Sequence, residues 1–312
     1  MWPVQSAEAQ DYPTKKITIV VTLASGSTMD VLARLLADGL QRSFGQPVII
    51  DNQPIAAGTV GAANVAKAPA DGYTLLVTSS GVLAIAPSLY KTLNFDAEKS
   101  FVPIAFYQNT FFVLAVNTKV PATSIAALVT LSRQSPKPLS FSSPGAGTPQ
   151  HLLLELTKSS FSAEFVHVPY NNTMQALTDI VGGHVSAGFV EAGSALPLIR
   201  DGQLRAVAIS SDAGRRHLPE TPVTNFEVNG SKFEPVGWHA MLAPSATPRE
   251  VLDKLHRELS RTINSAEFNS KVSEFGLIPV DNPQIGQMQT FMRSQREKWG
   301  SVIGGIGLLG SR

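Results

Sequence analysis

The chain has 312 residues, enough for two lobes of ordinary domain size that each bury a core. Charged residues make up 16% of it and the formal net charge is +1, so it lacks the positive field that attracts nucleic acid or anionic lipid, and we expect neither as a partner. The absence of cysteine excludes disulfides, thiolate zinc sites and cysteine nucleophiles.

The first residues indicate export rather than structure. Ala7-Glu8-Ala9 has the small-x-small form of a signal-peptidase site, although neither a charged region nor an apolar one precedes it. An arbitrary alanine-rich start is the alternative, so we expect residues 1–11 to be an export-signal remnant or a tag. No later apolar run approaches the ~20 residues of a membrane span.

The next part of the chain predicts strands that alternate with helices. Short β-branched runs predict strands, and apolar residues at helical spacing follow each one. Gly45 stands where a helix often ends on a left-handed residue. The expected elements are strands at 17–21, 47–50 and 73–77, and helices at 29–40 and 59–67.

From about residue 105 a second series of the same kind begins. We expect strands at 111–116, 139–142, 164–168 and 185–190, and helices from Ser124, Pro149 and Thr173. Residues 210–233 are rich in Pro, Gly and Asn and predict a loop that returns the chain to the first lobe. Such alternation implies right-handed crossovers and parallel strands. The fold class is therefore α/β, with lobe 1 at 12–104 and 226–312 and lobe 2 at 105–225.

The last part of the chain predicts a helix with a clear start. Thr247 stands at an N-cap, Pro248 at the first helical position and Glu250 at the third, so we expect a helix to about Asn264. A strand at 278–280 and a helix at 283–299 complete the expected elements.

Loops rich in hydroxyl groups follow four of the expected strands, where ligands bind in open α/β sheets. Each precedes an expected helix, whose N-terminal N–H groups and partial positive charge favour an anionic oxygen without any Lys or Arg. The candidate residues are Ser25, Gly26, Ser27, Thr28, Thr78, Ser79, Ser80, Ser142, Ser143, Gly147, Thr148 and Tyr170. The alternative is that these residues are ordinary caps and turns.

Two further candidate residues have side chains that can gain or lose a proton. Glu191 ends an expected strand and could accept a hydrogen bond from a ligand, or it could cap the following helix. His239 follows Trp238 in an apolar stretch, where the pair could place a polar tip against the ligand or simply pack in the core. No nucleotide-binding glycine motif, G-x-S-x-G elbow or metal-ligand spacing of histidines occurs.

A series of short motifs occurs in order between Tyr12 and Gly300. They are Tyr12-Pro13, Asp30-Val31-Leu32-Ala33-Arg34, Gly45-Gln46-Pro47-Val48, Asp71-Gly72-Tyr73-Thr74-Leu75-Leu76, Pro87-Ser88-Leu89-Tyr90, His167-Val168-Pro169-Tyr170, Ala176-Leu177-Thr178-Asp179 with Gly182-Gly183, Ser194-Ala195-Leu196-Pro197, and Leu242-Ala243-Pro244 with Thr247-Pro248. Together they resemble the Bug, or TctC, family of substrate-binding proteins for tripartite tricarboxylate transporters.

The resemblance implies a periplasmic, non-enzymatic protein with a two-lobed Venus flytrap fold of the type II-like periplasmic-binding-protein class. It implies a small carboxylate as ligand, the membrane components of the transporter as partners, no cofactor or metal, and a monomer. Carried over by position, the loops at 25–28 and 78–81, Ser142-Ser143 with Gly147-Thr148, and Tyr170 would line the ligand. The scarcity of Arg near these loops fits a carboxylate held by backbone N–H and hydroxyl groups.

The sequence departs from the family pattern in the same loops. Ala24-Ser25-Gly26-Ser27 replaces the usual Pro-Pro-Gly-Gly, Leu83 and Ala86 replace His and Asn, and His239 replaces an aromatic residue. Val190 stands where the family has the Asp credited with holding an amine, so an amino-acid ligand is not expected. The added hydroxyls of the first loop and His239 would suit a second, distal carboxylate, as on a dicarboxylate or an aromatic diacid such as terephthalate.

Two alternatives use the same residues differently. An α/β hydrolase or lyase could employ His239 and Glu191 as acid and base, if both reached one substrate. A sensor domain that presents its ligand to a membrane receptor would differ only in its outer surface.

Overall fold

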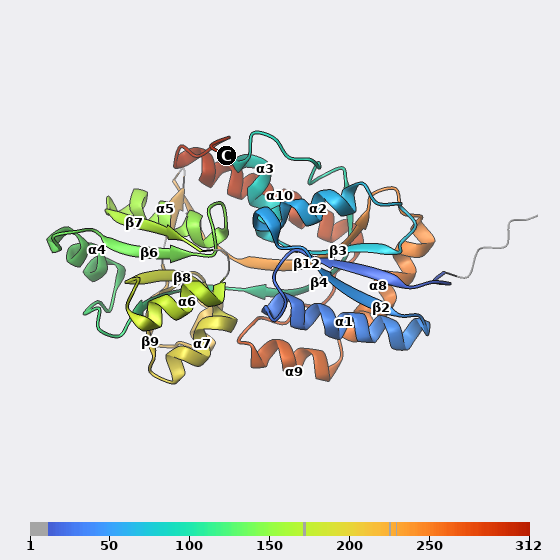
Figure 1. Ribbon diagram of the computed structural model, residues 1–312, viewed down its shortest axis with the longest axis horizontal. Coiled ribbons are helices and arrows are strands. Elements are labelled where there is room, and N and C mark those ends of the chain that lie inside the picture. The colour runs from blue at the N-terminus through green and yellow to red at the C-terminus, as the bar shows by residue number, and fades with distance from the viewer. Residues whose placement is uncertain (1–11, 171–172, 225, 229) are drawn as a thin grey trace, which may run out of the picture.

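The computed structural model describes residues 12–170, 173–224, 226–228 and 230–312. The expected export remnant at 1–11, and Asn171 and Asn172 of the fourth loop, lie outside these residues. Two five-stranded sheets flanked by helices lie side by side in Figure 1, as the expected two-lobed α/β fold requires. The boundaries of the lobes at residues 104 and 225 stay predictions.

The first sheet has the strand order β2-β1-β3-β12-β4. Its central strands are buried along nearly their whole length, and β12 runs antiparallel to both neighbours. The strands are β1 (Ile17–Val21), β2 (Val48–Asn52), β3 (Thr74–Ser79), β4 (Phe101–Thr110) and β12 (Gly237–Pro244).

The second sheet has the order β7-β6-β8-β5-β9 and repeats this plan, because β5 alone runs against its neighbours. Each sheet is therefore mixed, with one reversed strand among parallel ones. The strands are β5 (Phe112–Asn117), β6 (Leu139–Ser143), β7 (Phe165–Pro169), β8 (Ala187–Glu191) and β9 (Leu204–Ile209).

Helices cover both sheets, and most start where the sequence predicts them. Ser27, Ser124 and Thr148 cap the helices that follow them with their side-chain oxygens, which satisfies N–H groups of the first turn. The α-helices are α1 (Thr28–Phe44), α2 (Thr59–Ala66), α3 (Ala86–Leu89), α4 (Ile125–Gln134), α5 (Pro149–Phe161), α6 (Thr173–Gly182), α7 (Ala192–Arg200), α8 (Arg249–Ile263), α9 (Ala266–Glu274) and α10 (Ile285–Gly305). Within the described part of the chain, none of these helices has the length and apolarity to cross a bilayer.

Short helical turns complete the described elements. They are η1 (Ile55–Gly58), the π-helical turn η2 (Gly81–Ile85) and η3 (Asp212–Arg216). The turn η2 matters for the site, because it begins directly after β3 and its neighbour Ser80.

Three local expectations were wrong. The predicted loop at 210–233 contains η3 and a hairpin of β10 (Phe226–Val228) and β11 (Ser231–Phe233). Pro248, with an extended ψ of 140°, is the N-cap of α8, so the helix starts one residue later and the Thr247 hydroxyl has no hydrogen-bond partner among the described residues. The expected strand at 278–280 is reduced to one bridge between Ile278 and Asn109.

Two strands join the lobes. β4 continues almost directly into β5 of the second sheet, and β12 starts beside the end of β4, with Gly237 opposite Thr110 (Figure 1). Ser210 ties this junction together, because its hydroxyl accepts a hydrogen bond from the Phe112 N–H (2.9 Å) and donates one to the Pro235 carbonyl (2.8 Å). The connection between the lobes thus consists of two neighbouring chain segments, which Ser210 holds together by hydrogen bonds.

Candidate ligand-binding site between the lobes

The first loop, between β1 and α1, is organised by a buried carboxylate. Asp30 accepts hydrogen bonds from the Gly26 N–H (2.9 Å), the Asn52 amide (2.9 Å) and the Arg34 guanidinium (3.0 and 3.1 Å). Burial by itself would raise the pKa of Asp30, but the hydrogen bonds from Arg34, Gly26 and Asn52 outweigh it and hold that pKa below its usual value. Gly26 has a φ of +82°, which favours glycine.

The expected side-chain donors of this loop already have partners. The Ser27 hydroxyl accepts from the Asp30 N–H, and the Ser25 hydroxyl lies 3.5 Å from the Asp30 carboxylate. Thr28 opens α1, and Ser27 is the N-cap of that helix. The loop therefore offers a ligand its helix N-terminus more readily than its hydroxyls.

The second loop follows β3. The Thr78 hydroxyl is buried and accepts a hydrogen bond of 2.8 Å from Thr22, so Thr78 is tied to β1. Ser80 is buried, and Ser79 lies at the end of the strand opposite His239 of β12.

The third loop, between β6 and α5, is held by two histidines. Thr148 caps α5 and donates to the Gly145 carbonyl (2.7 Å). The Ser143 hydroxyl is hydrogen-bonded to His167 Nε2 (2.7 Å), and the Gly147 N–H donates to His151 Nδ1 (3.2 Å).

The two histidine rings are 4.3 Å apart between centroids. Burial, then the neighbouring His167, lowers the pKa of His151 to about 4, so its ring stays neutral and can accept the Gly147 N–H. Ser142 is buried in β6 beside this loop. His151 thus holds the backbone of this loop, and His167 holds the Ser143 side chain.

The fourth loop adds Tyr170. Its backbone N–H donates to the Ser143 carbonyl (2.9 Å), which fixes it beside the third loop. Its hydroxyl donates to Asp179 (2.6 Å), and burial followed by this hydrogen bond raises the pKa of Tyr170 to about 12. The Tyr170 hydroxyl is therefore already used in a hydrogen bond to Asp179 of α6.

Loops of the two lobes lie against one another. A Cβ added to Gly193, in the first turn of α7, would lie 3.1 Å from Thr28 Cγ2 and 2.8 Å from the Phe275 carbonyl. A Cβ added to Gly81 would lie 3.4 Å from Pro149 Cδ. The N-terminus of α7 therefore lies against that of α1, and the turn after β3 lies against that of α5, so these segments form two contacts between the lobes.

Glu191 and His239 lie beside these contacts. Glu191 immediately precedes α7, and His239 lies opposite Ser79 at the end of β3. Glu191 ends β8 as the N-cap residue of α7, and its side chain makes no cap hydrogen bond within the described part of the chain. Burial raises the pKa of its carboxyl to about 7. His239 is buried in β12, where burial lowers its pKa to about 3, so the imidazole is neutral.

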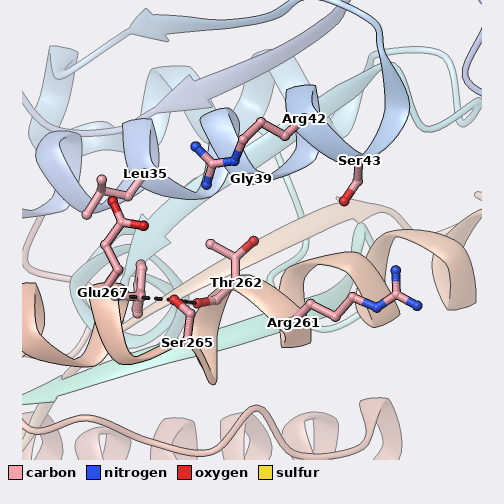
Figure 2. Close-up of a pocket in the computed structure, with 9 residues that line it drawn as sticks. Leu35, Gly39, Arg42, Ser43, Arg261, Thr262, Ser265 and Glu267 are labelled. Atoms are coloured by element: carbon pink, nitrogen blue, oxygen red, sulfur yellow. Dashed lines mark hydrogen bonds between the residues drawn. The ribbon is translucent and has the colours of Figure 1, made fainter.

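A separate pocket of about 270 Å³ lies on lobe 1, between α1, α8 and α9 (Figure 2). Figure 2 shows Arg42 of α1 and Arg261 of α8 on its two sides, and Arg261 is paired with Glu258 at 2.8 Å. None of the candidate residues lines it. We place the candidate site between the lobes instead, because the N-termini of α1, α5 and α7 lie at the contacts between the lobes.

A family model described as "Tripartite tricarboxylate transporter family receptor" matches residues 32–308. The chain belongs to this family, TctC. It is 32% identical to Protein BugT of Bordetella pertussis over 297 residues, which are 95% of this chain and 90% of BugT. The family and the similar solved structures are substrate-binding proteins of transporters rather than enzymes.

Solved structures agree in fold with this TctC chain. The structure of R. palustris Rpa4515 with adipate has a TM-score of 0.86 and 31% identity, covering 95% of this chain and 99% of that one. The periplasmic binding protein BugD has a TM-score of 0.85 and 27% identity, covering 96% and 99%. The two-lobed periplasmic-binding-protein fold, expected from the sequence, is confirmed.

Proposed function

We propose that this TctC protein is a periplasmic receptor that captures a small carboxylate between its lobes and delivers it to the membrane components of a tripartite tricarboxylate transporter. The proposal is supported by helix N-termini of both lobes, those of α1, α5 and α7, which lie at the contacts between the lobes. Each terminus presents N–H groups and a partial positive charge, so together they favour an anion without a cationic side chain. We propose that the receptor works as a monomer.

A dicarboxylate or an aromatic acid such as terephthalate is the favoured ligand. The Rpa4515 structure holds adipate, a dicarboxylate, and this chain is 31% identical to it. Glu191 and His239 would face the far end of such a ligand. Val190 argues against an amino acid, because no carboxylate at that position would pair with an ammonium group.

A thermal-shift screen over a few dozen carboxylic acids tests the proposal. A ligand that binds only the native state stabilises it by about 2.7 kcal/mol at a hundredfold excess over Kd, which raises Tm by roughly 5 °C in a chain of this size. Calorimetric titration with terephthalate, phthalate, adipate and glutamate then ranks the ligands. We expect a diacid to bind most tightly; a preference for glutamate, or no shift with any acid, contradicts the proposal.

A further inference from the structure

Two histidine rings lie against one another behind the third loop. His151 belongs to the first turn of α5 and His167 to β7, and their planes are inclined by 30°. His151 is 8% exposed and His167 is half-buried. Apolar side chains of similar size would fill the same space at a lower cost of desolvation, so the rings are needed for the hydrogen bonds that they make.

His151 holds the backbone of the loop. Its Nδ1 accepts the Gly147 N–H at 3.2 Å, which requires that this nitrogen carry no proton. Gly147 has a φ of +88°, and a Cβ added to it would lie 2.6 Å from Leu89 Cδ2 of α3, in the first lobe. The bond from His151 therefore fixes the peptide of a residue that packs against the other lobe.

His167 holds the start of the loop. Its Nε2 lies 2.7 Å from the hydroxyl oxygen of Ser143, which is buried at the end of β6. The same oxygen accepts the Gly145 N–H at 3.2 Å. The two rings thus fix the loop at two points, one near the end of β6 and one directly before α5.

Two N–H groups of the loop are left for a ligand. The other N–H groups are used by the bonds to Ser143 and His151 or by the bonds of Thr148. Within the part of the chain that the structure describes, the N–H groups of Ala146 and Gln150 have no acceptor. Both lie where α5 begins, and free N–H groups there favour an anion.

We propose that His151 and His167 are positioning residues of the carboxylate site. They hold the third loop in the shape in which the N–H groups of Ala146 and Gln150 can bind one carboxylate together. The histidines act through the loop rather than on the ligand. This inference rests on the proposed function, since the ligand must be a carboxylate that binds at the third loop.

Charged groups surround the two rings. The Glu155 carboxylate of α5 lies 3.9 Å from His151 Nε2 and is paired with Lys158 at 3.0 Å. Lys158 and Arg312, which follows α10, disfavour a positive charge on either ring, whereas Glu155 favours one on His167. Burial is the largest cause that lowers the pKa of both rings.

The bond between His151 and Gly147 should therefore fail only in acid. The pKa of His151 is lowered to about 4, so the ring is neutral at pH 7 and can accept the N–H. At pH 4 about half of the chains carry a protonated ring, which cannot accept it. If binding needs the neutral ring, the apparent Kd doubles at that pH.

Calorimetric titration with adipate and terephthalate at pH 7 tests the positioning role. His151→Leu fills the same space without an acceptor and should weaken binding about tenfold. His151→Asn places Oδ1 where Nδ1 lies and should restore binding to within about threefold of wild type.

His256→Leu is the matched control. His256 of α8 also bonds to the backbone, at the Ile104 carbonyl (3.0 Å), but it lies on the first lobe away from the third loop. This variant loses a comparable hydrogen bond and should keep wild-type affinity. Thermal melts of all variants verify folding, and a loss of stability shared by both leucine variants does not explain a loss of affinity in only one.

The pH profile gives a readout that packing alone would not change. The ratio of the wild-type Kd to that of His151→Asn is measured between pH 7 and pH 4, because protonation of the acid itself affects both proteins equally. We expect this ratio to rise about twofold, since only the wild type has a titrating acceptor. A constant ratio contradicts the role of His151.

A double-variant cycle tests whether His167 acts through Ser143. His167→Leu and Ser143→Ala each remove the same hydrogen bond, so the double variant should bind no more weakly than the weaker single variant. Additive losses would mean that the two side chains act independently.

The outcomes separate this inference from the function beneath it. Wild-type affinity in His151→Leu, or equal losses in His151→Leu and His151→Asn, overturns the positioning role while the carboxylate receptor stands. If His151→Leu does not fold, the pH profile of His151→Asn decides. If the wild-type protein binds neither acid, both proposals fail.

Discussion

Gly193→Ala should weaken carboxylate binding by more than about tenfold, although alanine is the better helix former by about 1 kcal/mol. The added Cβ would lie 2.8 Å from the Phe275 carbonyl of the opposite lobe, and a backbone atom cannot move aside as a side-chain tip can. The lobes would therefore be held apart, so that donors of one lobe no longer reach a ligand bound to the other. Calorimetric titration with adipate measures the loss.

Gly286→Ala is the matched control for this substitution. Gly286 also lies in a helix, α10, but a Cβ there meets nothing within 4 Å. It should keep wild-type affinity and gain a few tenths of a kcal/mol to about 1 kcal/mol in stability. Small-angle scattering should show that ligand compacts the control but not Gly193→Ala. Wild-type affinity in Gly193→Ala would mean that closure of the lobes is not needed for binding.

Asp30→Asn should lower the free energy of unfolding by about 2 kcal/mol and weaken carboxylate binding about tenfold. The neutral amide loses the bidentate pair with Arg34 and cannot accept from Gly26, Asn52 and Arg34 together. Since the pKa of Asp30 is lowered in the folded protein, its stabilisation is present above about pH 4 and is lost as pH falls through that lowered pKa. Urea unfolding at pH 7 measures the first effect and calorimetry the second.

An exposed pair provides the comparison for Asp30. Arg249 and Asp253 form an i,i+4 ion pair on α8 with the charges in the reverse order, and both side chains are largely exposed. Asp253→Asn should change stability by less than about 0.5 kcal/mol and leave binding unaltered. A similar small effect of Asp30→Asn would show that the first loop keeps its shape without the carboxylate.

Periodicity explains which elements the sequence could predict. Amphipathic helices such as α1 and short β-branched strands such as β1 show clear patterns, and their order implies the parallel sheets. β4 and β12 were missed as strands because Pro103 interrupts the apolar run of β4, and β12 contains no β-branched residue. These two strands make the junction between the lobes, which sequence patterns alone could not place.

The candidate site also has features that the sequence could predict and features that it could not. The rule that ligands bind at the carboxyl ends of strands located the four loops, and two of their hydroxyl residues, Ser27 and Thr148, proved to be helix caps. The sequence did not predict that Asp30 holds the first loop in place, because an acidic residue is common in the first turn of a helix. Contact between any of these residues and a ligand stays a prediction.

The most direct measurement is a crystal structure of the complex with the acid that binds most tightly. The account predicts one carboxylate within hydrogen-bonding distance of backbone N–H groups at the N-terminus of α1 in one lobe and of α5 or α7 in the other. An acid seated in the pocket between α1, α8 and α9, or held by one lobe alone, would contradict it.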